Sequence, residues 1–327
     1  MMKRLFAYII CLLLPTLLAA QKVVSIKVEG SVNPASAAFI NNAIKKATDE
    51  KAECLIIHLN TPGGLLKSTR VIVSNILEAT MPVVVYVSPG GAHAGSAGVF
   101  ITMAGHIAAM TPSTNIGAAH PVNMQGGMDS TMNSKTTNDA AAFIRTIAEK
   151  RKRNLTWAEE AVRNSVSITE AEALDQKVID IIAVNEQDLL KQIDNKTIEL
   201  NGVLKTLHTS KAQVQRIEMN FVENFLNIIS DPNIAYILMM LGFYGMLFEL
   251  YSPGAIVPGI VGVICLVLAF YSMHTLPLNY AGFALIVFGI ILFVLEVKII
   301  SHGLLGIGGA ISLALGLIML IRTDSAL

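Results

Sequence analysis

One serine stands in a stretch of small residues that suits nucleophilic chemistry. Ser96 lies in the sequence GGAHAGSAG at 90–98, between an apolar run at 83–87 and a second at 99–104. We predict a buried strand before this stretch and a helix after it. A helix N-terminus carries unpaired N–H groups and a partial positive charge, and both favour a serine oxygen that must become an anion. The alternative interpretation is a tight turn in which Ser96 only caps the helix.

A serine of this kind needs a base, because its hydroxyl oxygen is a weak nucleophile until the proton is removed. Lys135 is one candidate. A lysine serves only where apolar surroundings lower its pKa toward neutrality. Among the residues that follow it, the first carboxylate is Asp139, which is compatible with a desolvated amine. An ordinary surface lysine is the alternative.

Histidines offer further candidate bases. His93, His106 and His120 all lie within reach in the sequence. A Ser-His-Asp triad of Ser96 with His120 and Asp129 is conceivable, but nothing in the spacing selects it. The Gly-x-Ser-x-Gly elbow of many hydrolases is absent, since position 94 is alanine.

Apolar runs and helical periodicity predict the elements that position these groups. We expect strands at 23–28, 54–59, 83–87, 107–110 and 178–184, and helices at 35–50, 66–79, 99–104 and 157–164. This alternation favours an α/β fold with a mainly parallel sheet, where ligands gather at the carboxyl ends of the strands. Gly63-Gly64 and Ser96 follow two such ends, so we place them in one site. The N–H groups of Gly64 (with Gly63) and Ala97 are candidate oxyanion donors.

The segment before Lys135 is poor in charge and rich in glycine and methionine. We interpret most of 116–134 as a mobile loop, with a helix starting near Thr136 or Asp139. Thr169 and Glu172 fit a capping box for a later helix. Apolar residues at helical spacing in 211–229 indicate an amphipathic segment that either lies on a membrane surface or packs on its own domain.

Composition points to a membrane protein. Hydrophobic residues make up 53% of the 327 residues and charged residues 15%, with a mean hydropathy of +0.57. The net charge of zero gives no support for a nucleic-acid partner. The three cysteines, Cys11, Cys54 and Cys265, fall in separate segments, so we expect no disulfide, no metal site and no cofactor.

Four apolar segments approach the roughly 20 residues that a bilayer requires. They are 234–250, 255–273, 280–297 and 303–321. A repeat at an offset of 47 residues, the separation of Glu249 from Glu296, also pairs Gly242 with Gly289, Gly259 with Gly306 and Gly262 with Gly309. We interpret it as two tandem helical hairpins with glycine-lined contacts and glutamates at headgroup level. A chance match in a biased composition is the alternative.

The N-terminus has the features of a secretory leader. Lys3 and Arg4 precede an apolar run and Ala19-Ala20. We predict a signal peptide at 1–20, with an uncleaved membrane anchor as the alternative. The expected organisation is then an exported domain at 21–205, an amphipathic linker at 206–232 and a four-helix transmembrane domain at 233–322.

Several motifs together resemble the NfeD family of membrane-bound, Clp-protease-like serine proteases. They are NTPGG at 60–64, GAHAGSAG at 91–98, Lys135, SITEAEAL at 167–174, ELYSPG at 249–254 and PGIVG at 258–262. The resemblance implies a Clp/crotonase-like domain, with Ser96 as nucleophile, Lys135 as general base, and Gly64 and Ala97 as oxyanion donors. Long family members carry a C-terminal β-barrel domain, which we do not expect in a chain that stops at Leu327.

The resulting hypothesis is a membrane-anchored serine endopeptidase with a Ser-Lys dyad that cleaves apolar segments of a stomatin-like protein. We expect a multi-pass protein of the cell (inner) membrane, in contact with lipid, forming a homo-oligomer and carrying its protease domain on the extracytoplasmic side. A non-catalytic scaffold that binds a stomatin-like partner is the alternative. An acyl-CoA enzyme on a crotonase-like fold is weaker, because an exported domain would seldom meet coenzyme A.

Overall fold

The computed structural model describes residues 21–122, 130–251, 256–273, 280–298 and 303–320. The predicted signal peptide at 1–20 and the candidate Asp129 lie outside these ranges. The chain forms two compact units, which divide between Asn227 and Ile228. Each unit is described by itself.

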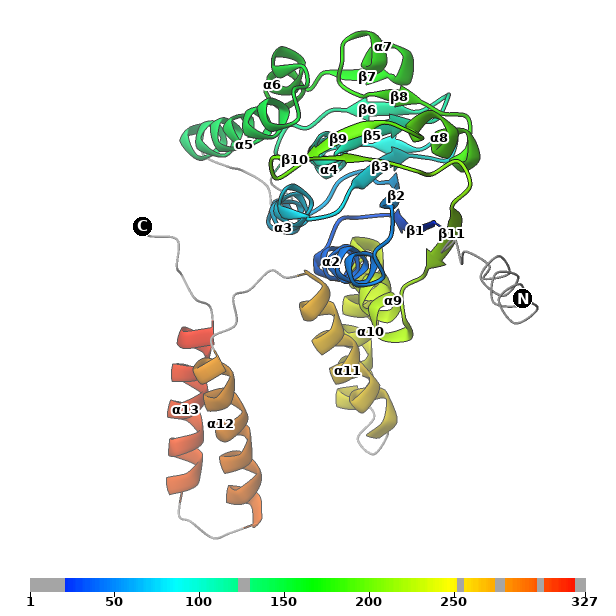
Figure 1. Ribbon diagram of the computed structural model, residues 1–327. Helices are drawn as coiled ribbons and strands as arrows, with labels where there is room; N and C mark the ends of the chain where they lie inside the picture. The colour runs from blue at the N-terminus through cyan, green and yellow to red at the C-terminus, as the bar shows by residue number, and fades with distance from the viewer. Residues whose placement is uncertain (1–20, 123–129, 252–255, 274–279, 299–302, 321–327) are drawn as a thin grey trace, which may run out of the picture. The chain divides into compact units, whose positions relative to one another are not determined.

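A six-stranded parallel sheet forms the centre of the first unit (Figure 1). Its strands, in spatial order, are β11 (Gln213–Ile217), β1 (Lys22–Glu29), β2 (Cys54–Asn60), β3 (Val83–Val87), β5 (Ile107–Met110) and β8 (Ile181–Ile182). All five neighbouring pairs are parallel. Strands buried on both faces are near-continuous apolar runs, and VVVYV in β3 is buried throughout.

Alternate residues of the strands enter two separate cores, one on each face of the sheet. The larger core joins Leu55 and Ile57 of β2 to apolar side chains of the helices α2 to α6. These helices are α2 (Pro34–Asp49), α3 (Leu66–Glu78), α4 (Ala97–Ala104), α5 (Ser130–Lys150) and α6 (Leu155–Arg163). The smaller core joins Cys54 and Ile56 to α8 (Glu186–Ile193) and to the hairpin of β9 (Thr197–Leu200) and β10 (Val203–Thr206).

A small second sheet lies at the carboxyl ends of the central strands. It consists of β4 (His93–Ala94), β6 (Asn115–Gly117) and β7 (Ser167–Thr169). The helix α7 (Glu170–Asp175) follows directly, and the predicted capping box of Thr169 and Glu172 is present at its start. Thr61, just after β2, pairs with Ala94 and so connects the two sheets.

Three expectations about elements were wrong. The helix expected to start near Thr136 or Asp139 begins at Ser130, since the residues TMNS before Lys135 are already helical. Lys135 therefore lies inside α5. The strand expected at 178–184 is only Ile181–Ile182, and it is not the last strand. The segment expected as one amphipathic helix at 211–229 divides into β11, which pairs with β1, and the short helix α9 (Phe221–Ile229).

The second unit contains the four helices that the apolar segments predict. They are α10 (Pro232–Tyr251), α11 (Ile256–Met273), α12 (Tyr280–Lys298) and α13 (Leu304–Leu320). Within the described ranges, no single helix is both long and apolar enough to cross a membrane. One bent pair, Phe221–Ile229 with Asn233–Glu249, meets that requirement together, by length and composition.

The 47-residue repeat is visible in the packing of the two hairpins. A Cβ at Gly242 would lie 2.6 Å from Leu266, and one at Gly289 would lie 2.9 Å from Leu313, the repeat equivalents. Each glutamate lies against the start of the next helix. Glu296 accepts hydrogen bonds from the N–H groups of Gly303 and Gly306 at 3.1 and 2.9 Å, a favourable site for a carboxylate at a helix N-terminus.

Candidate active site

Ser96 stands at the N-cap position of α4 in an unusual backbone conformation. Its φ and ψ angles are 46° and −106°, outside the regions that residues with a Cβ normally occupy. Such strain costs on the order of 1–3 kcal/mol and persists where the surroundings enforce it. Here the Ser96 N–H donates to the carbonyl of Ala118 at 2.7 Å.

The hydroxyl of Ser96 is not used as a helix cap. It makes no side-chain capping hydrogen bond, and within the described part of the chain it has no other hydrogen-bond partner. The side chain is half-buried. The interpretation of Ser96 as a capping serine is therefore wrong, and the hydroxyl remains available for another role.

The structure brings the Gly63-Gly64 turn to Ser96, as the position of both at strand ends predicts. The turn is fixed by hydrogen bonds from Thr61 N–H to the His93 carbonyl at 2.8 Å and from Gly95 N–H to the Thr61 carbonyl at 2.9 Å. Gly63 has φ +135°, and a Cβ there would lie 2.7 Å from the Ser96 Cβ and 3.2 Å from its Oγ. Only glycine permits this approach.

Two backbone N–H groups of the Gly63-Gly64 turn and the start of α4 lack an acceptor within the described ranges. The N–H groups of Gly64 and Ala97 donate to no acceptor among the residues that the structure describes. The N–H of Gly63, in contrast, donates to Thr61 Oγ1 at 3.0 Å. Gly63 thus supplies space next to the serine, whereas Gly64 and Ala97 retain the free donors that an oxyanion requires.

Lys135 is not assembled with Ser96. It lies in the second turn of α5, its side chain is exposed, and it forms no hydrogen bond or ion pair with another described residue. The expectation of a lysine surrounded by apolar groups is not met in this state of the chain. The residues 123–129, which precede α5, lie outside those described.

The histidines have other partners. His106 accepts from the Val83 N–H at 3.2 Å, and burial, with Arg151 and Arg153 nearby, lowers its pKa to about 3. His120 Nδ1 donates to the Val162 carbonyl at 2.9 Å. The ring of His93 lies close to Gly95, where a Cβ would meet its Nε2 at 2.2 Å.

Two arginines hold the far end of the serine helix. Arg151 Nε donates to the Ala104 carbonyl at 2.7 Å, and Arg153 donates to Met103 and Gly105 at 3.2 and 2.9 Å. These are terminal carbonyls of α4, which carry its partial negative charge. Arg153 is only 6% exposed. The guanidinium groups therefore fix α4, and with it the position of Ser96.

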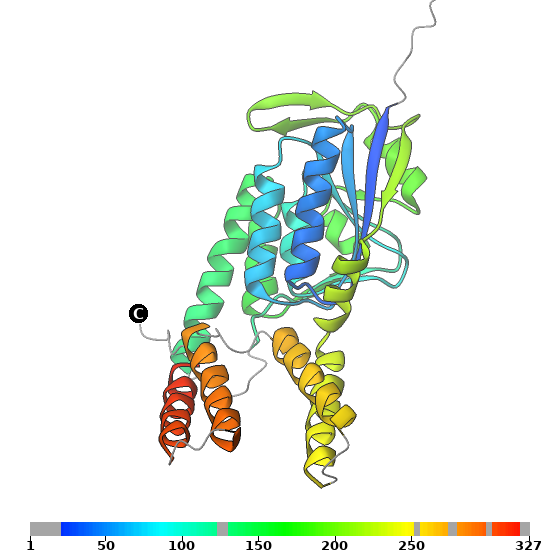
Figure 2. The same ribbon diagram turned by 90° about the horizontal axis from the view of Figure 1, so that it is seen from below.

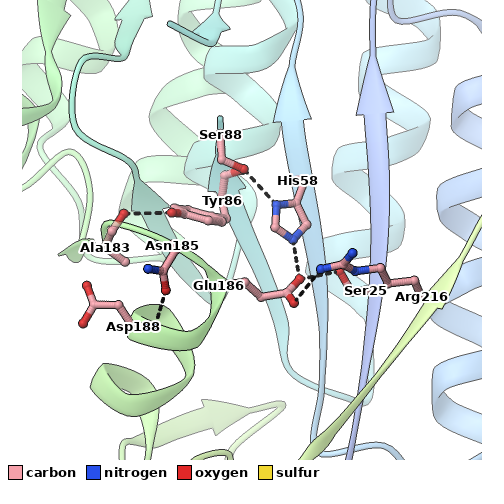
Figure 3. Close-up of polar contacts among 9 residues, drawn as sticks. All are labelled: Ser25, His58, Tyr86, Ser88, Ala183, Asn185, Glu186, Asp188 and Arg216. Carbon is pink, nitrogen blue, oxygen red and sulfur yellow. Dashed lines mark hydrogen bonds and ion pairs between the residues drawn. The ribbon is translucent and has the colours of Figure 1, made fainter. Parts of the chain in front are cut away.

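A second polar chain, which sequence reasoning missed, links Ser88, His58 and Glu186 (Figure 3). His58 contacts Ser88 Oγ through Nδ1 and Glu186 Oε2 through Nε2, both at 2.8 Å. Ser25 donates to the same carboxylate oxygen at 2.9 Å. The hydrogen bond from His58 lowers the pKa of Glu186 to about 2, and the hydrogen bond from Ser25 and the positive charge of Arg216 act in the same direction.

A serine, a histidine and a carboxylate in this order also form the catalytic triad of many hydrolases. The surroundings of Ser88 differ from those of Ser96, however. Ser88 is 6% exposed, and its backbone N–H donates to the Leu59 carbonyl at 3.2 Å. We interpret this chain as a structural link that joins α8 to β1 and β2. Its sequence signal was partial, because His58 and Ser88 stand at adjacent strand ends while Glu186 is remote.

Comparison with known proteins first defines the class. The family profile described as the NfeD1b N-terminal domain matches residues 22–217, and the one described as the NfeD integral membrane domain matches residues 233–327. The first unit thus corresponds to the N-terminal domain of NfeD1b, and the match to an integral membrane domain makes the chain a membrane protein. The chain belongs to the NfeD family.

Two curated relatives cover most of the chain. Membrane-bound protease PH1510 of Pyrococcus horikoshii is 33% identical over 325 residues, which are 98% of this chain and 74% of the relative. Membrane protein NfeD1b of Bacillus subtilis is 31% identical over 310 residues, which are 89% of this chain and 66% of the relative.

Solved structures agree in fold. The 1510-N membrane-bound stomatin-specific protease, as a lysine-to-alanine mutant in complex with a substrate peptide, matches with a TM-score of 0.60 and 31% identity, over 65% of this chain and 99% of that one. A serine-to-alanine mutant of 1510-N matches with a TM-score of 0.59 and 32% identity, over 62% and 100%.

Proposed function

We propose that the chain is a membrane-bound serine endopeptidase that cleaves apolar segments of a stomatin-like membrane protein. The observation that carries the proposal is the free Ser96 hydroxyl in a strained turn, flanked by the open N–H groups of Gly64 and Ala97. The relatives support the choice of substrate, since 1510-N is named a stomatin-specific protease.

The proposed reaction passes through an acyl-enzyme. Ser96 Oγ attacks the scissile carbonyl carbon while the uncharged amine of Lys135 takes the hydroxyl proton. The N–H groups of Gly64 and Ala97 stabilise the resulting oxyanion. The C–N bond then breaks, the leaving amine takes the proton from Lys135, and a water molecule hydrolyses the ester to release the acid and restore Ser96.

The exposed position of Lys135 gives this proposal a second part. We propose that bound peptide, or a second copy of the chain, brings the lysine to Ser96 and completes the dyad. Structures of the chain with and without an apolar peptide test this part. A fully formed dyad in both structures would contradict it.

Full-length protein in detergent, incubated with a library of apolar peptides, tests the activity. We expect Ser96→Ala to abolish cleavage and Lys135→Ala to lower kcat/KM by at least about 100-fold, the usual contribution of a general base. Lys150→Ala, an exposed lysine at the other end of α5, should cleave normally. Full turnover by either dyad mutant would refute the assignment. An inactive wild type whose Ser96 also resists a fluorophosphonate in the presence of peptide would favour the scaffold alternative.

A further inference from the structure

The helix α9 is attached to the first unit through its polar face. Asn42 Nδ2 donates to Glu223 Oε1 at 3.0 Å, and Asn33 Nδ2 donates to Asn227 Oδ1 at 2.9 Å. Both asparagines belong to α2 or its N-cap, and Figures 1 and 2 show α9 beside α2. Residues four apart share one face of a helix, so Glu223 and Asn227 define the attached side.

The apolar face of α9 therefore points away from this attachment. Phe221, Phe225 and Ile228, spaced as on one helical face, are 86%, 44% and 49% exposed, and the neighbouring Val222 is 61% exposed. An amphipathic helix of a globular domain normally buries such a stripe and exposes its polar residues. The reversed arrangement leaves an apolar surface that needs another environment.

The chain itself indicates which environment that is. Three residues after α9, at Pro232, the apolar helix α10 begins, and the match to the integral membrane domain starts at residue 233. Because only two residues separate the helices, the C-terminal end of α9 lies close to the membrane domain. The sequence of α9, FVENFLNII, has no lysine or arginine, so its attraction to a bilayer rests on apolar burial rather than on anionic headgroups.

We propose that α9 is an interfacial docking helix. Phe221, Phe225 and Ile228 insert at the boundary between headgroups and acyl chains, while Asn33 and Asn42 hold the polar face to the α/β domain. The helix thereby attaches the proposed protease domain to the bilayer surface. This inference does not depend on catalysis, since its test reads the position of a side chain.

Tryptophan fluorescence of the full chain in phosphatidylcholine vesicles tests the proposal. Trp157 is the chain's one tryptophan and is 2% exposed, so it supplies a constant background. We expect the tryptophan introduced by Phe225→Trp, and separately by Phe221→Trp, to have its emission maximum at a shorter wavelength than a water-exposed tryptophan. Their added emission should be quenched mainly by a spin label near the headgroup and little by aqueous acrylamide, in low and high NaCl alike.

Leu204→Trp is the matched control. Leu204 is an apolar residue of β10 that is 72% exposed, and its hairpin lies away from α9 in both views (Figures 1 and 2). Acrylamide should quench this tryptophan and the lipid label should not. If the α9 tryptophans behave like the control, the face is in water and the proposal is wrong. Protection from both quenchers would place a protein surface over α9, a second copy or another partner, and would overturn the proposal equally.

Discussion

Replacement of Gly63 by alanine should slow peptide cleavage by about 100-fold or more while the domain remains folded. The added Cβ would lie 2.7 Å from the Ser96 Cβ and 3.2 Å from its Oγ. Carbon atoms in contact prefer a separation of about 3.5–4.0 Å, so Ser96 or the 61–64 turn must move by roughly 1 Å. The turn is held by hydrogen bonds from both sides of Thr61, and α4 is held at its far end by Arg151 and Arg153.

A displacement of that size has different consequences for stability and for rate. The positive φ of Gly63 adds backbone strain of about 1–2 kcal/mol for a residue with a Cβ, which a domain stable by about 5–15 kcal/mol tolerates. Misplacing a catalytic group by about 1 Å can cost roughly 100-fold in rate. We therefore expect a fall in kcat/KM of about 100-fold or more with a modest loss of stability.

Gly91→Ala separates the two effects. Gly91 belongs to the same loop and also has a positive φ, +85°, but a Cβ there meets no atom within 4 Å. In thermal unfolding followed by Trp157 fluorescence, Gly91→Ala should show the cost of the positive φ alone and Gly63→Ala a somewhat larger loss, because its Cβ also meets Ser96. Only Gly63→Ala should lose peptide cleavage. If Gly63→Ala cleaves as well as Gly91→Ala, the contact between Gly63 and Ser96 does not position the nucleophile, and the reasoning fails.

Two further predictions concern stability, measured by the same unfolding assay. Arg153→Met should destabilise the first unit by about 3–5 kcal/mol, because it leaves Asp180 and two helix carbonyls without their buried partner. The control is Arg145→Met, which removes an exposed ion pair with Glu159 and should cost about 0.5 kcal/mol or less. Equal losses would contradict the role of Arg153. Because the folded pKa of Glu186 is lowered from 4.5 to about 2, its ionised form contributes stability that is complete above about pH 5 and is lost as the pH falls toward 2. Glu186→Gln should lower the free energy of unfolding by about 1–3 kcal/mol at pH 7 and by little near pH 2. Glu149→Gln, on the exposed side of α5, should leave the free energy of unfolding unchanged at both pH values. A loss on Glu186→Gln that does not depend on pH would refute the linkage.

The central part of the fold and the surroundings of Ser96 could be predicted because their signals are local. Each inner strand is a short apolar run, and the rule that ligand groups gather at the ends of parallel strands places Gly63 beside Ser96 without knowledge of any long-range contact. The tandem hairpins were also predictable, because the repeat relates one hairpin to the next, with Gly242 and Leu266 in the first corresponding to Gly289 and Leu313 in the second.

The remaining features depend on partners that the local sequence does not reveal. The strand β11, QVQRI, does not alternate regularly between apolar and polar residues, since Val214 and Ile217 lie on opposite faces. Its strand character comes from pairing with β1, nearly 200 residues earlier in the chain. The link from His58 to Glu186 spans 128 positions. The orientation of α9 on the first unit was not predictable either. Periodicity identifies the apolar face of a helix, but it does not reveal that Asn33 and Asn42 bind the opposite, polar face.

The two halves of the proposed dyad differ in how far the fold prepares them. The serine's half is built from backbone, with a strained Ser96 and with N–H groups of Gly64 and Ala97 that donate to no acceptor in the described part of the chain. The base's half is an exposed lysine in the second turn of α5, with no hydrogen bond or ion pair to another described residue. A bound apolar peptide would exclude water from the space over the site, and a lysine acts as a base in such dry surroundings. Under the proposed function, the substrate or a second copy of the chain completes the base's half, and completion by the substrate would by itself make cleavage selective for apolar segments.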